Sequence, residues 1–288
     1  MIVKLIGGLG NQMFQYAFAY AKKNKTQLQL DITGFHSDGL RQYKLDKFCI
    51  DASIVSVAEA NQLKYENESL STSLLRRLVR KEKPFSNSYY KERCFQFDNA
   101  ALIVSEEAYF DGYWQSEKYF SDYRDELLKQ FGLKAPVHSK SKEYQQKIQS
   151  TQAVSMHIRR GDYVTNTRTN EVHGLCSLEY YRKAVSFIQE REAQLHFFIF
   201  SDDLKWAKEN LGFIDNVTFV ELETDALDHE EMWLMSQCQH NIIANSSFSW
   251  WGAWLNENPN KMVIAPKQWF ADTSIDTSDL MPDGWVRL

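Results

Sequence analysis

From residue 153 onward, short apolar runs alternate with segments whose apolar residues recur at helical spacing. The apolar runs cover residues 153–159, 195–201, 217–222, 241–246 and 262–266, and the helical segments lie near 177–190, 204–211, 230–239 and 247–256. Short apolar runs of this kind are typical of strands buried on both faces, and strands joined by helices form a parallel sheet. The pattern therefore predicts a doubly wound α/β layer in this part of the chain.

The N-terminal segment has the same character. An apolar run at 2–6 ends in Gly7 and Gly8, a segment with helical spacing follows at 11–23, and residues 28–32 alternate as a strand does. Strand, glycine turn, helix and strand together predict a βαβ unit with a parallel pair of strands.

The middle of the chain is less regular. Residues 51–95 are polar, and helices with one solvated or membrane-facing side are the expected content. Residues 134–150 are rich in Lys, Ser and Gln, and we interpret them as a helical connector at a domain boundary. We therefore expect an α/β fold with two domains, 1–150 with a helical middle and 151–288.

Composition excludes several classes of protein. The net charge is -5 and the pI is near 5.9, so no overall basic field attracts nucleic acid. The four cysteines show no CxxC pair, which fits neither a disulfide framework nor a zinc site, and we interpret them as reduced thiols. No apolar run reaches the ~18 residues of a membrane span, and the N-terminal apolar run is too short for a signal peptide. A cytoplasmic location is expected.

Polar residues follow the predicted strands at the point where each strand ends. They occupy 7–12, 157–162, 201–203 and 245–249. In an open α/β sheet the ligand lies beyond the carboxyl ends of the strands. These four segments are therefore the candidate site.

The segment "HIRRGDY" begins at His157. Strand alternation puts His157 and Arg159 on one side, with Asp162 beyond a glycine turn. The guanidinium of Arg159 offers a planar fork of donors that suits a phosphate. The alternative is an internal Arg-Asp ion pair that holds the turn.

The segment "SDD" places Asp202 and Asp203 after a strand. Either carboxylate can cap the next helix or bind a ribose, a base or an arginine. The two aspartates are adjacent rather than spaced as Asp-x-Asp, so no metal is expected.

The segment "NSSFSWWG" follows the run "NIIA". Asn245, Ser246 and Ser247 form a turn, and a helix that starts near Ser247 or Phe248 aims its free amides at one point. The serines can act as helix caps, as phosphate donors, or as both, which we favour. The nearby tryptophans fit a core better than a sugar-stacking surface.

The segment "GGLGNQ" has neither P-loop nor dinucleotide-site spacing. It offers close backbone approach and the two amide side chains of Asn11 and Gln12 at a helix start. The alternative is a tight turn with a capping asparagine.

Taken together, "GGLGNQMFQYAFAYA", "GYWQSEKYF", "HIRRGDY", "HGLCSLEYY", "SDD" and "NSSFSWWGAWL" resemble the bacterial α-1,2-fucosyltransferases of glycosyltransferase family 11. The resemblance implies a GT-B-like fold of two Rossmann-like domains, with an acceptor side in 1–150 and GDP-fucose bound by 151–288. It implies an inverting, metal-independent transfer of L-fucose from GDP-fucose to the 2-hydroxyl of a terminal galactose in an O-antigen, capsule or lactose-type glycan.

The resemblance also assigns residues. Arg159 would hold the β-phosphate, while His157 and Asp162 order the same turn. Asn11 would face the fucose and the acceptor. The implied donor site is Gly10, Asn11, His157, Arg159, Asp202, Asp203, Asn245, Ser246, Ser247 and Phe248. The predicted catalytic residues are Asn11 and Arg159 from the resemblance, together with Asp162 and His173, which are candidates for a base.

No motif marks the general base, for which Asp162, His173 and Asp31 are the candidates. A basic run occupies positions 76 to 83. Its members are Arg76, Arg77, Arg80, Lys81 and Lys83. It is a solvated helix face, or it touches the anionic inner membrane. Two other functions stay open: a fucosyltransferase of another linkage, such as α-1,6, and a nucleotide-sugar or glycan-binding module without turnover.

Overall fold

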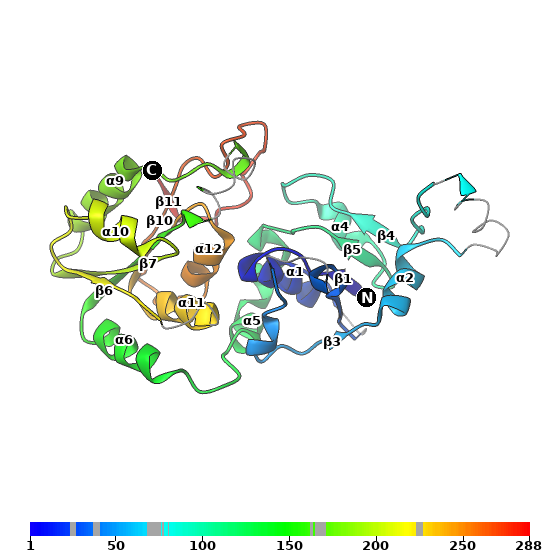
Figure 1. Cartoon of the computed structure of the whole chain (residues 1–288), viewed down its shortest axis with the longest axis horizontal. Helices are drawn as coiled ribbons and strands as arrows, with labels where there is room; N and C mark the ends of the chain where they lie inside the picture. Colours follow the sequence, from blue (N-terminus) through cyan, green and yellow to red (C-terminus); the bar gives the residue numbers. More distant parts are fainter. Residues whose placement is uncertain are drawn as a thin grey trace. The chain divides into compact units, whose positions relative to one another are not determined.

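The computed structural model describes residues 1–23, 27–36, 41–67, 76, 78–79, 81–161, 164, 171–222 and 227–288. The chain divides into two compact units (Figure 1). The first unit comprises Met1–Gly132 with Ser278–Leu280, and the second comprises Leu133–Thr277 with Met281–Leu288. Each unit is built around a sheet whose described strand pairs are parallel.

The first unit has a five-stranded sheet in the order β3-β2-β1-β5-β4. Its strands are β1 (Ile2–Lys4), β2 (Gln29–Asp31), β3 (Ser53–Ile54), β4 (Tyr89–Lys91) and β5 (Tyr109–Asp111), and its helices are α1 (Leu9–Lys22), α2 (Val57–Lys64), α4 (Asn99–Ile103) and α5 (Arg124–Gln130). Short 3-10 helices lie at Thr33–His36, Leu45–Lys47, Glu117–Tyr119 and Ser121–Tyr123. The expected parallel pair of β1 and β2 is confirmed.

Helix α1 packs an aromatic face into the core of this unit. Phe18 is fully buried and stacks on Trp114, with ring centroids 4.2 Å apart and planes within 9°. Phe110 of β5 meets the same ring of Phe18 at 5.3 Å. Aromatic pairs in these geometries add about 0.5–1.5 kcal/mol each beyond the burial of their area. The contacts fix α1 against β5 and the chain that follows it.

The polar middle of the chain contains strands as well as helices. The sequence predicted helices across 51–95, yet β3 and β4 lie there and form the two edges of the first sheet. Both are only two or three residues long and half-buried or exposed, so neither produces a clear apolar run. That part of the prediction is wrong.

The second unit has a six-stranded sheet in the order β11-β10-β9-β6-β7-β8. Its strands are β6 (Gln152–Ile158), β7 (Leu195–Ser201), β8 (Val217–Phe219), β9 (His240–Ile242), β10 (Val263–Ala265) and β11 (Val286–Arg287), and its helices are α6 (Ser139–Gln149), α9 (Leu178–Gln189), α10 (Leu204–Asn210), α11 (Asp228–Ser236) and α12 (Ser247–Trp254). Taken from its first strand, β6, the sheet runs to β7 and β8 on one side and to β9, β10 and β11 on the other. This is the doubly wound order of nucleotide-binding domains, as the sequence predicted.

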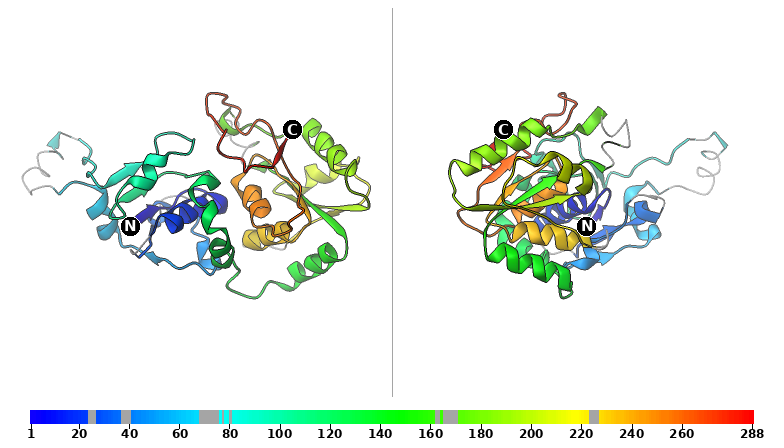
Figure 2. Two further views of the ribbon diagram at one scale, coloured as in Figure 1. Left: turned by 180° about the vertical axis from the view of Figure 1, so that it is seen from behind. Right: turned by 60° about the vertical axis from the view of Figure 1, so that its left-hand side comes forward.

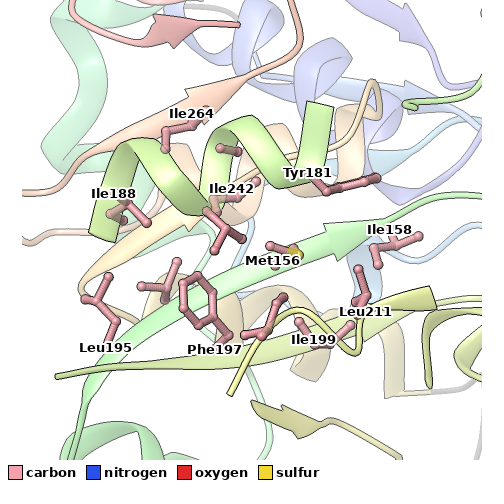
Figure 3. Close-up of a cluster of buried hydrophobic side chains, with 14 of the residues drawn as sticks. Met156, Ile158, Tyr181, Ile188, Leu195, Phe197, Ile199, Leu211, Ile242 and Ile264 are labelled. Atoms are coloured by element: carbon pink, nitrogen blue, oxygen red, sulfur yellow. The ribbon is translucent and has the colours of Figure 1, made fainter. Parts of the chain in front are cut away.

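Helices cover both faces of this sheet (Figure 2). On one face Met156, Phe197 and Ile199 pack with residues of α9 and α10, and Figure 3 shows Tyr181 and Ile188 of α9 over these strands. The other face packs alternate strand residues against α6 and α11. Burial on both faces explains why these strands read as continuous apolar runs.

The boundary between the units lies between Gly132 and Leu133, whereas the sequence placed it after residue 150. The predicted connector is helix α6, and it belongs to the second unit. Tyr144 and Ile148, four residues apart on one helix face, are buried in the core cluster of that unit. The helix docks on the sheet through these two apolar residues of an otherwise polar segment. Among the described residues, no helix has both the length and the apolar character needed to cross a bilayer.

Candidate functional site

The carboxyl ends of β6 and β9 lie side by side in the second sheet. Met156 pairs with Ile242, so the segments that follow the two strands continue next to each other. The strand order reverses between β6 and β9, and open α/β sheets bind ligands at such a point. The ring centroids of His157 and Phe248 are 5.6 Å apart. Two of the predicted donor-site segments therefore meet here.

Arg159 pairs with the first aspartate after β7. Its Nη1 lies 2.8 Å from Asp202 Oδ2, and the backbone N–H of Arg160 donates to Asp202 Oδ1 at 2.8 Å. Binding of an arginine by "SDD", one of the alternatives for that segment, is therefore present, whereas Asp162 of the "HIRRGDY" turn lies outside the described residues. A guanidinium carries five N–H donors, so Asp202 engages only part of Arg159 and holds it in one orientation at the strand end.

A glycine allows this close approach. A Cβ atom added to Gly161 would lie 2.6 Å from Asp202 Oδ2, closer than side-chain carbon and oxygen atoms pack. Any larger residue at Gly161 would push the carboxylate away from Arg159.

Asp203, the second aspartate after β7, caps a helix and pairs with Arg160. Asp203 Oδ1 accepts from the backbone N–H of Trp206 at 3.1 Å and caps α10, while its Oδ2 lies 3.2 Å from Arg160 Nε. The guanidinium of Arg160 lies 4.1 Å from the centroid of the Trp206 ring. Helix capping by Asp203, one of the alternatives for this segment, is confirmed. A contact of Asp202 or Asp203 with a nucleoside stays a prediction.

Helix α12 begins directly after the turn that follows β9. Ser246 is the N-cap, and its Oγ accepts from the backbone N–H of Phe248 at 3.3 Å. Ser247 and Phe248 are half-buried. The helix is long enough to present the N–H groups of its first turn and its dipole to an anion at this end. Its tryptophans belong to the core, as predicted. Trp250, Trp251 and Trp254 are each at most 2% exposed.

Asn245 uses its side chain to hold two loops together. Its Nδ2 donates to the carbonyl oxygen of His173 at 2.8 Å and of Trp269 at 3.1 Å, and Cys176 Sγ lies 3.4 Å from its Oδ1. The side chain is 3% exposed. The ring of the predicted catalytic residue His173 lies 5.4 Å from the Phe270 ring in the same pair of loops. Asn245 thus fixes the surroundings of His173, and a contact of its own with the donor stays a prediction.

His157 is held in its neutral form. Burial, with a smaller effect of the positive charge on Arg159, lowers the pKa of His157 to about 3. No described residue forms a hydrogen bond with its Nδ1. The Tyr181 hydroxyl donates to the His157 carbonyl oxygen at 3.2 Å. At neutral pH this ring adds no positive charge to the site, and a contact of His157 with the donor stays a prediction.

The low pKa of His157 should make the stability of the folded protein depend on pH. Between the ordinary histidine pKa of about 6.5 and the folded value of about 3, the unfolded chain binds a proton that the folded chain does not. The free energy of unfolding therefore falls as the pH falls through this window, by up to 1.36 kcal/mol per pH unit.

Urea unfolding of the parent and of His157→Gln tests this expectation. We expect the difference between their free energies of unfolding to be about 2 kcal/mol smaller at pH 5 than at pH 7.5. His36→Gln, at an exposed position, is the control. A gap that does not change with pH would contradict the neutral buried ring.

Two tyrosines of α9 form hydrogen bonds near the site that were not predicted from the sequence. The Tyr180 hydroxyl lies 2.7 Å from the carbonyl oxygen of Ile243 and 3.1 Å from that of Ile264. With Tyr181 on His157, the pair ties α9 to the ends of three strands. The motif "LEYY" was noted only as part of the resemblance. Two hydroxyl groups on an otherwise apolar helix face indicate that these tyrosines find hydrogen-bond partners in the core.

The predicted residues of the first unit lie where β1 meets α1. Gly7 has a φ of +79°, which favours glycine, and a Cβ there would lie 2.6 Å from Asn11 Nδ2. Gly10 is buried in the first turn of α1, and Asn11 is half-buried. Gly7 thus lies close to the Asn11 amide, while a close approach of this backbone to a ligand stays a prediction.

Among the base candidates, Asp31 is poorly placed. Its Oδ2 accepts from the Tyr109 hydroxyl at 2.5 Å, its Oδ1 accepts from the backbone N–H of Thr33 at 2.8 Å, and it is 3% exposed. Asp162, the candidate in the "HIRRGDY" turn, lies outside the described residues.

Two members of the basic run, Arg77 and Arg80, also lie outside the described residues. Among the residues that the structure does describe, no group of three or more His, Cys, Asp or Glu side chains is placed to hold a metal ion.

Two solved structures share the fold. A crystal structure of NodZ α-1,6-fucosyltransferase soaked with GDP-fucose aligns with a TM-score of 0.51 at 14% identity, covering 88% of this chain and 91% of that one. A crystal structure of POFUT1 in complex with GDP aligns with a TM-score of 0.50 at 13% identity, covering 92% and 97%. At such low identity the likeness concerns the fold alone. The two parallel-sheet domains have a GT-B-like fold.

Sequence comparison defines the family. The model of Glycosyl transferase family 11 matches residues 1–288. An alpha-1,2-colitosyltransferase of Escherichia coli is 37% identical, covering 100% of this chain and 98% of its own length, and the O-antigen biosynthesis glycosyltransferase WbnK of Escherichia coli is 34% identical, covering 99% of each. Galactoside alpha-(1,2)-fucosyltransferase 2 of Mus musculus is 24% identical, covering 88% of this chain and 67% of its own. The chain belongs to glycosyltransferase family 11, and the resemblance seen in the sequence is confirmed.

Proposed function

We propose that this protein transfers L-fucose from GDP-fucose to the 2-hydroxyl of a terminal galactose, with inversion at the sugar carbon. One observation carries this proposal. Arg159, at the end of β6, and the N-terminus of α12 lie together where the strand order reverses, and the chain belongs to family 11. A guanidinium and the first-turn N–H groups of a helix suit a diphosphate. The α-1,2 linkage in the names of two relatives supports the choice of the 2-hydroxyl.

The proposed reaction is a single in-line displacement. The galactose 2-oxygen forms a bond to the anomeric carbon while the bond from that carbon to the diphosphate oxygen breaks, and GDP leaves with the electron pair. Arg159 and the amides near Ser247 stabilise the negative charge that gathers on the leaving diphosphate. The hydroxyl proton passes to a base, for which Asp162 and His173 stay the candidates. Asn11 orients the reacting groups.

The two units have separate roles in this proposal. The second unit binds GDP-fucose through Arg159, His157 and the first turn of α12, and Asp202 and Asp203 support it there. The first unit serves the acceptor through Asn11 and the glycine loop at Gly10. The doubly wound order of the second sheet supports the assignment of the nucleotide to that unit.

Product analysis tests the proposal. The purified protein is incubated with GDP-fucose and a panel of galactosides, including lactose and lipid-linked O-antigen repeats, and products are analysed by mass spectrometry and for linkage. We expect a fucosyl group on the 2-position of galactose. A GDP-colitose arm covers the sugar in the name of the 37% identical relative. A different linkage, such as α-1,6, would replace the proposed regiochemistry. Stabilisation by GDP without any product would favour a binding module.

We further propose that transfer needs no metal ion. The charge on the leaving diphosphate is met by Arg159 and by helix amides rather than by spaced carboxylates that would hold a divalent cation. We expect kcat to change less than twofold when millimolar EDTA is added and then removed. The same assay without chelator is the control. Activity that EDTA abolishes and Mn²⁺ restores would disprove metal independence.

The basic run supports a proposed peripheral contact with anionic membrane. In the described part of this run, Leu78 is 82% exposed and Val79 is 57% exposed beside Arg76, Lys81 and Lys83. Exposed apolar residues among cations suit a lipid interface, at about 1 kcal/mol per basic residue near the surface. We expect the protein to sediment with phosphatidylglycerol vesicles at low salt, and a variant with Arg76, Lys81 and Lys83 changed to Glu to lose binding at least tenfold. Equal sedimentation of the two proteins would leave the run as a solvated face.

A further inference from the structure

The first turns of α1 carry three amide side chains, two of which are fully buried. Gln15 accepts from the backbone N–H of Ile6 at 3.0 Å and donates to the carbonyl oxygen of Gly112 at 3.0 Å. Gln12 donates to the carbonyl oxygens of Gly7, at 3.0 Å, and of residue 42, at 2.8 Å. Both glutamines are 0% exposed. They hold the loops around the glycine turn, whereas the half-buried Asn11 keeps access to solvent.

Asn11 has its own partner from another strand end. Gln115 Nε2 donates to Asn11 Oδ1 at 2.8 Å, and Gln115 is 7% exposed. Gln115 follows β5, and Asn11 follows β1. These strands are neighbours, and the order of the first sheet reverses between them. The bond therefore spans the point where an open α/β sheet offers its ligand site.

The turn that carries Gln115 is rigidly held. Both carboxylate oxygens of Glu92 accept backbone N–H groups, Oε2 from Tyr113 at 2.7 Å and Oε1 from Trp114 at 2.9 Å. Trp114 has a φ of +57°, a costly conformation for a bulky residue. Its ring is fully buried, and a Cβ on Gly112 would lie 2.8 Å from that ring. A strained turn persists only where its surroundings over-determine it, and here they fix the start of the Gln115 side chain.

We propose that Gln115 is a positioning residue that sets the orientation of the Asn11 amide. The hydrogen bond from Gln115 keeps Asn11 Oδ1 turned toward Gln115. Asn11 Nδ2 then lies next to Gly7, 2.6 Å from the position that a Cβ on this glycine would take. An amide presented in this way donates to a hydroxyl oxygen of a sugar, and a reversed amide would present an acceptor instead. This inference rests on the proposed role of Asn11 in sugar transfer.

A double-mutant cycle tests the coupling. Gln115→Met keeps the length of the side chain and removes the donor. We expect it to lower kcat about tenfold or more, with the KM for GDP-fucose changed less than threefold. If Gln115 acts through Asn11, adding Gln115→Met to Asn11→Ala lowers kcat no further. Equal losses in the two backgrounds would overturn the proposal.

A matched control separates positioning from support of the fold. Gln130 also bonds through its side chain within the first unit, since its Oε1 accepts from the Tyr16 hydroxyl at 2.6 Å and from the backbone N–H of Asp51 at 2.7 Å. Gln130→Met should lower the Tm without changing kcat by more than twofold. The small effect of Gln130→Met on kcat should be the same in the parent and in the Asn11→Ala variant.

A second readout does not depend on turnover. In ¹H–¹⁵N spectra the side-chain amide of Asn11 is identified by its loss in Asn11→Ala. We expect its two proton signals to shift toward unstructured values in Gln115→Met and to stay in place in Gln130→Met. Unmoved signals in Gln115→Met would overturn the proposal. A parent that transfers no sugar to any acceptor would instead refute the proposed function, and the spectra would still decide whether Gln115 orients the amide.

Discussion

Arg159→Ala should lower kcat for sugar transfer by about 10² to 10³ and leave the fold intact. The guanidinium lies at the end of β6 with Asp202 on one of its edges, so its orientation is set before a ligand arrives. A preorganised donor acts where charge gathers in the transition state, and no solvent has to reorganise around it. Removing Arg159 takes away the ion-pair partner of Asp202 Oδ2, while Oδ1 still accepts from the backbone N–H of Arg160. The Asp202 side chain is 25% exposed, so water can solvate it and the stability loss should be small.

The measurement is kcat at saturating GDP-fucose, with circular dichroism and Tm as checks on the fold. Arg182→Ala is a matched control on the same unit, because Arg182 lies exposed on α9 with its guanidinium 4.1 Å from the Phe213 ring centroid. It should retain parental turnover. Arg159→Lys should recover little, since an ammonium cannot donate from two parallel N–H groups. Turnover of Arg159→Ala within tenfold of the parent would remove this residue from the mechanism.

Asn245→Leu should destabilise the second unit by about 2 to 4 kcal/mol, which corresponds to a Tm lower by roughly 5 to 12 °C. The leucine has a similar shape but cannot donate. The carbonyl oxygens of His173 and Trp269 lose the amide protons they accept at 2.8 and 3.1 Å. Because Trp269 is 3% exposed, its carbonyl group has little access to replacement water. A buried acceptor left without a partner costs about 1 to 3 kcal/mol.

Calorimetric scans of parent and variant measure this loss. Asn210→Leu is the matched control, because its Nδ2 donates to one carbonyl oxygen, that of Trp206, at a half-buried position. It should lower the Tm by no more than about 3 °C. If the two variants lose the same stability, the loops at His173 and Trp269 do not depend on the Asn245 amide.

The sequence predicted the second sheet well because its strands are buried on both faces. Apolar residues predominate in both β6 and β7, and a strand of this composition can be recognised without knowing its partner strands. The edge strands β3 and β4 gave no such signal, since they are short and partly exposed. Helix α6 was recognised as a helix but assigned to a linker, because only Tyr144 and Ile148 reveal the face that docks.

The candidate site was located by where strands end, and its internal contacts were not predictable from the same rule. Arg159 and Asp202 are 43 positions apart (202 − 159), and which oxygen meets which nitrogen depends on the register of β6 against β7. The same holds for Gln115 and Asn11, which meet across β1 and β5. The sequence shows which polar groups reach a sheet edge, while the pairing among them follows from the twist and spacing of the strands.

Helix α12 is enclosed by the protein on nearly every side. Its three tryptophans are buried, and a Cβ on Gly252 would lie 2.9 Å from the Cβ of Met235 in α11. Almost any enlargement in the buried part of this helix would clash, so we expect substitutions there to be tolerated poorly. A change in the sugar that is carried is then easier to reach through the loops around α12 than through the helix itself.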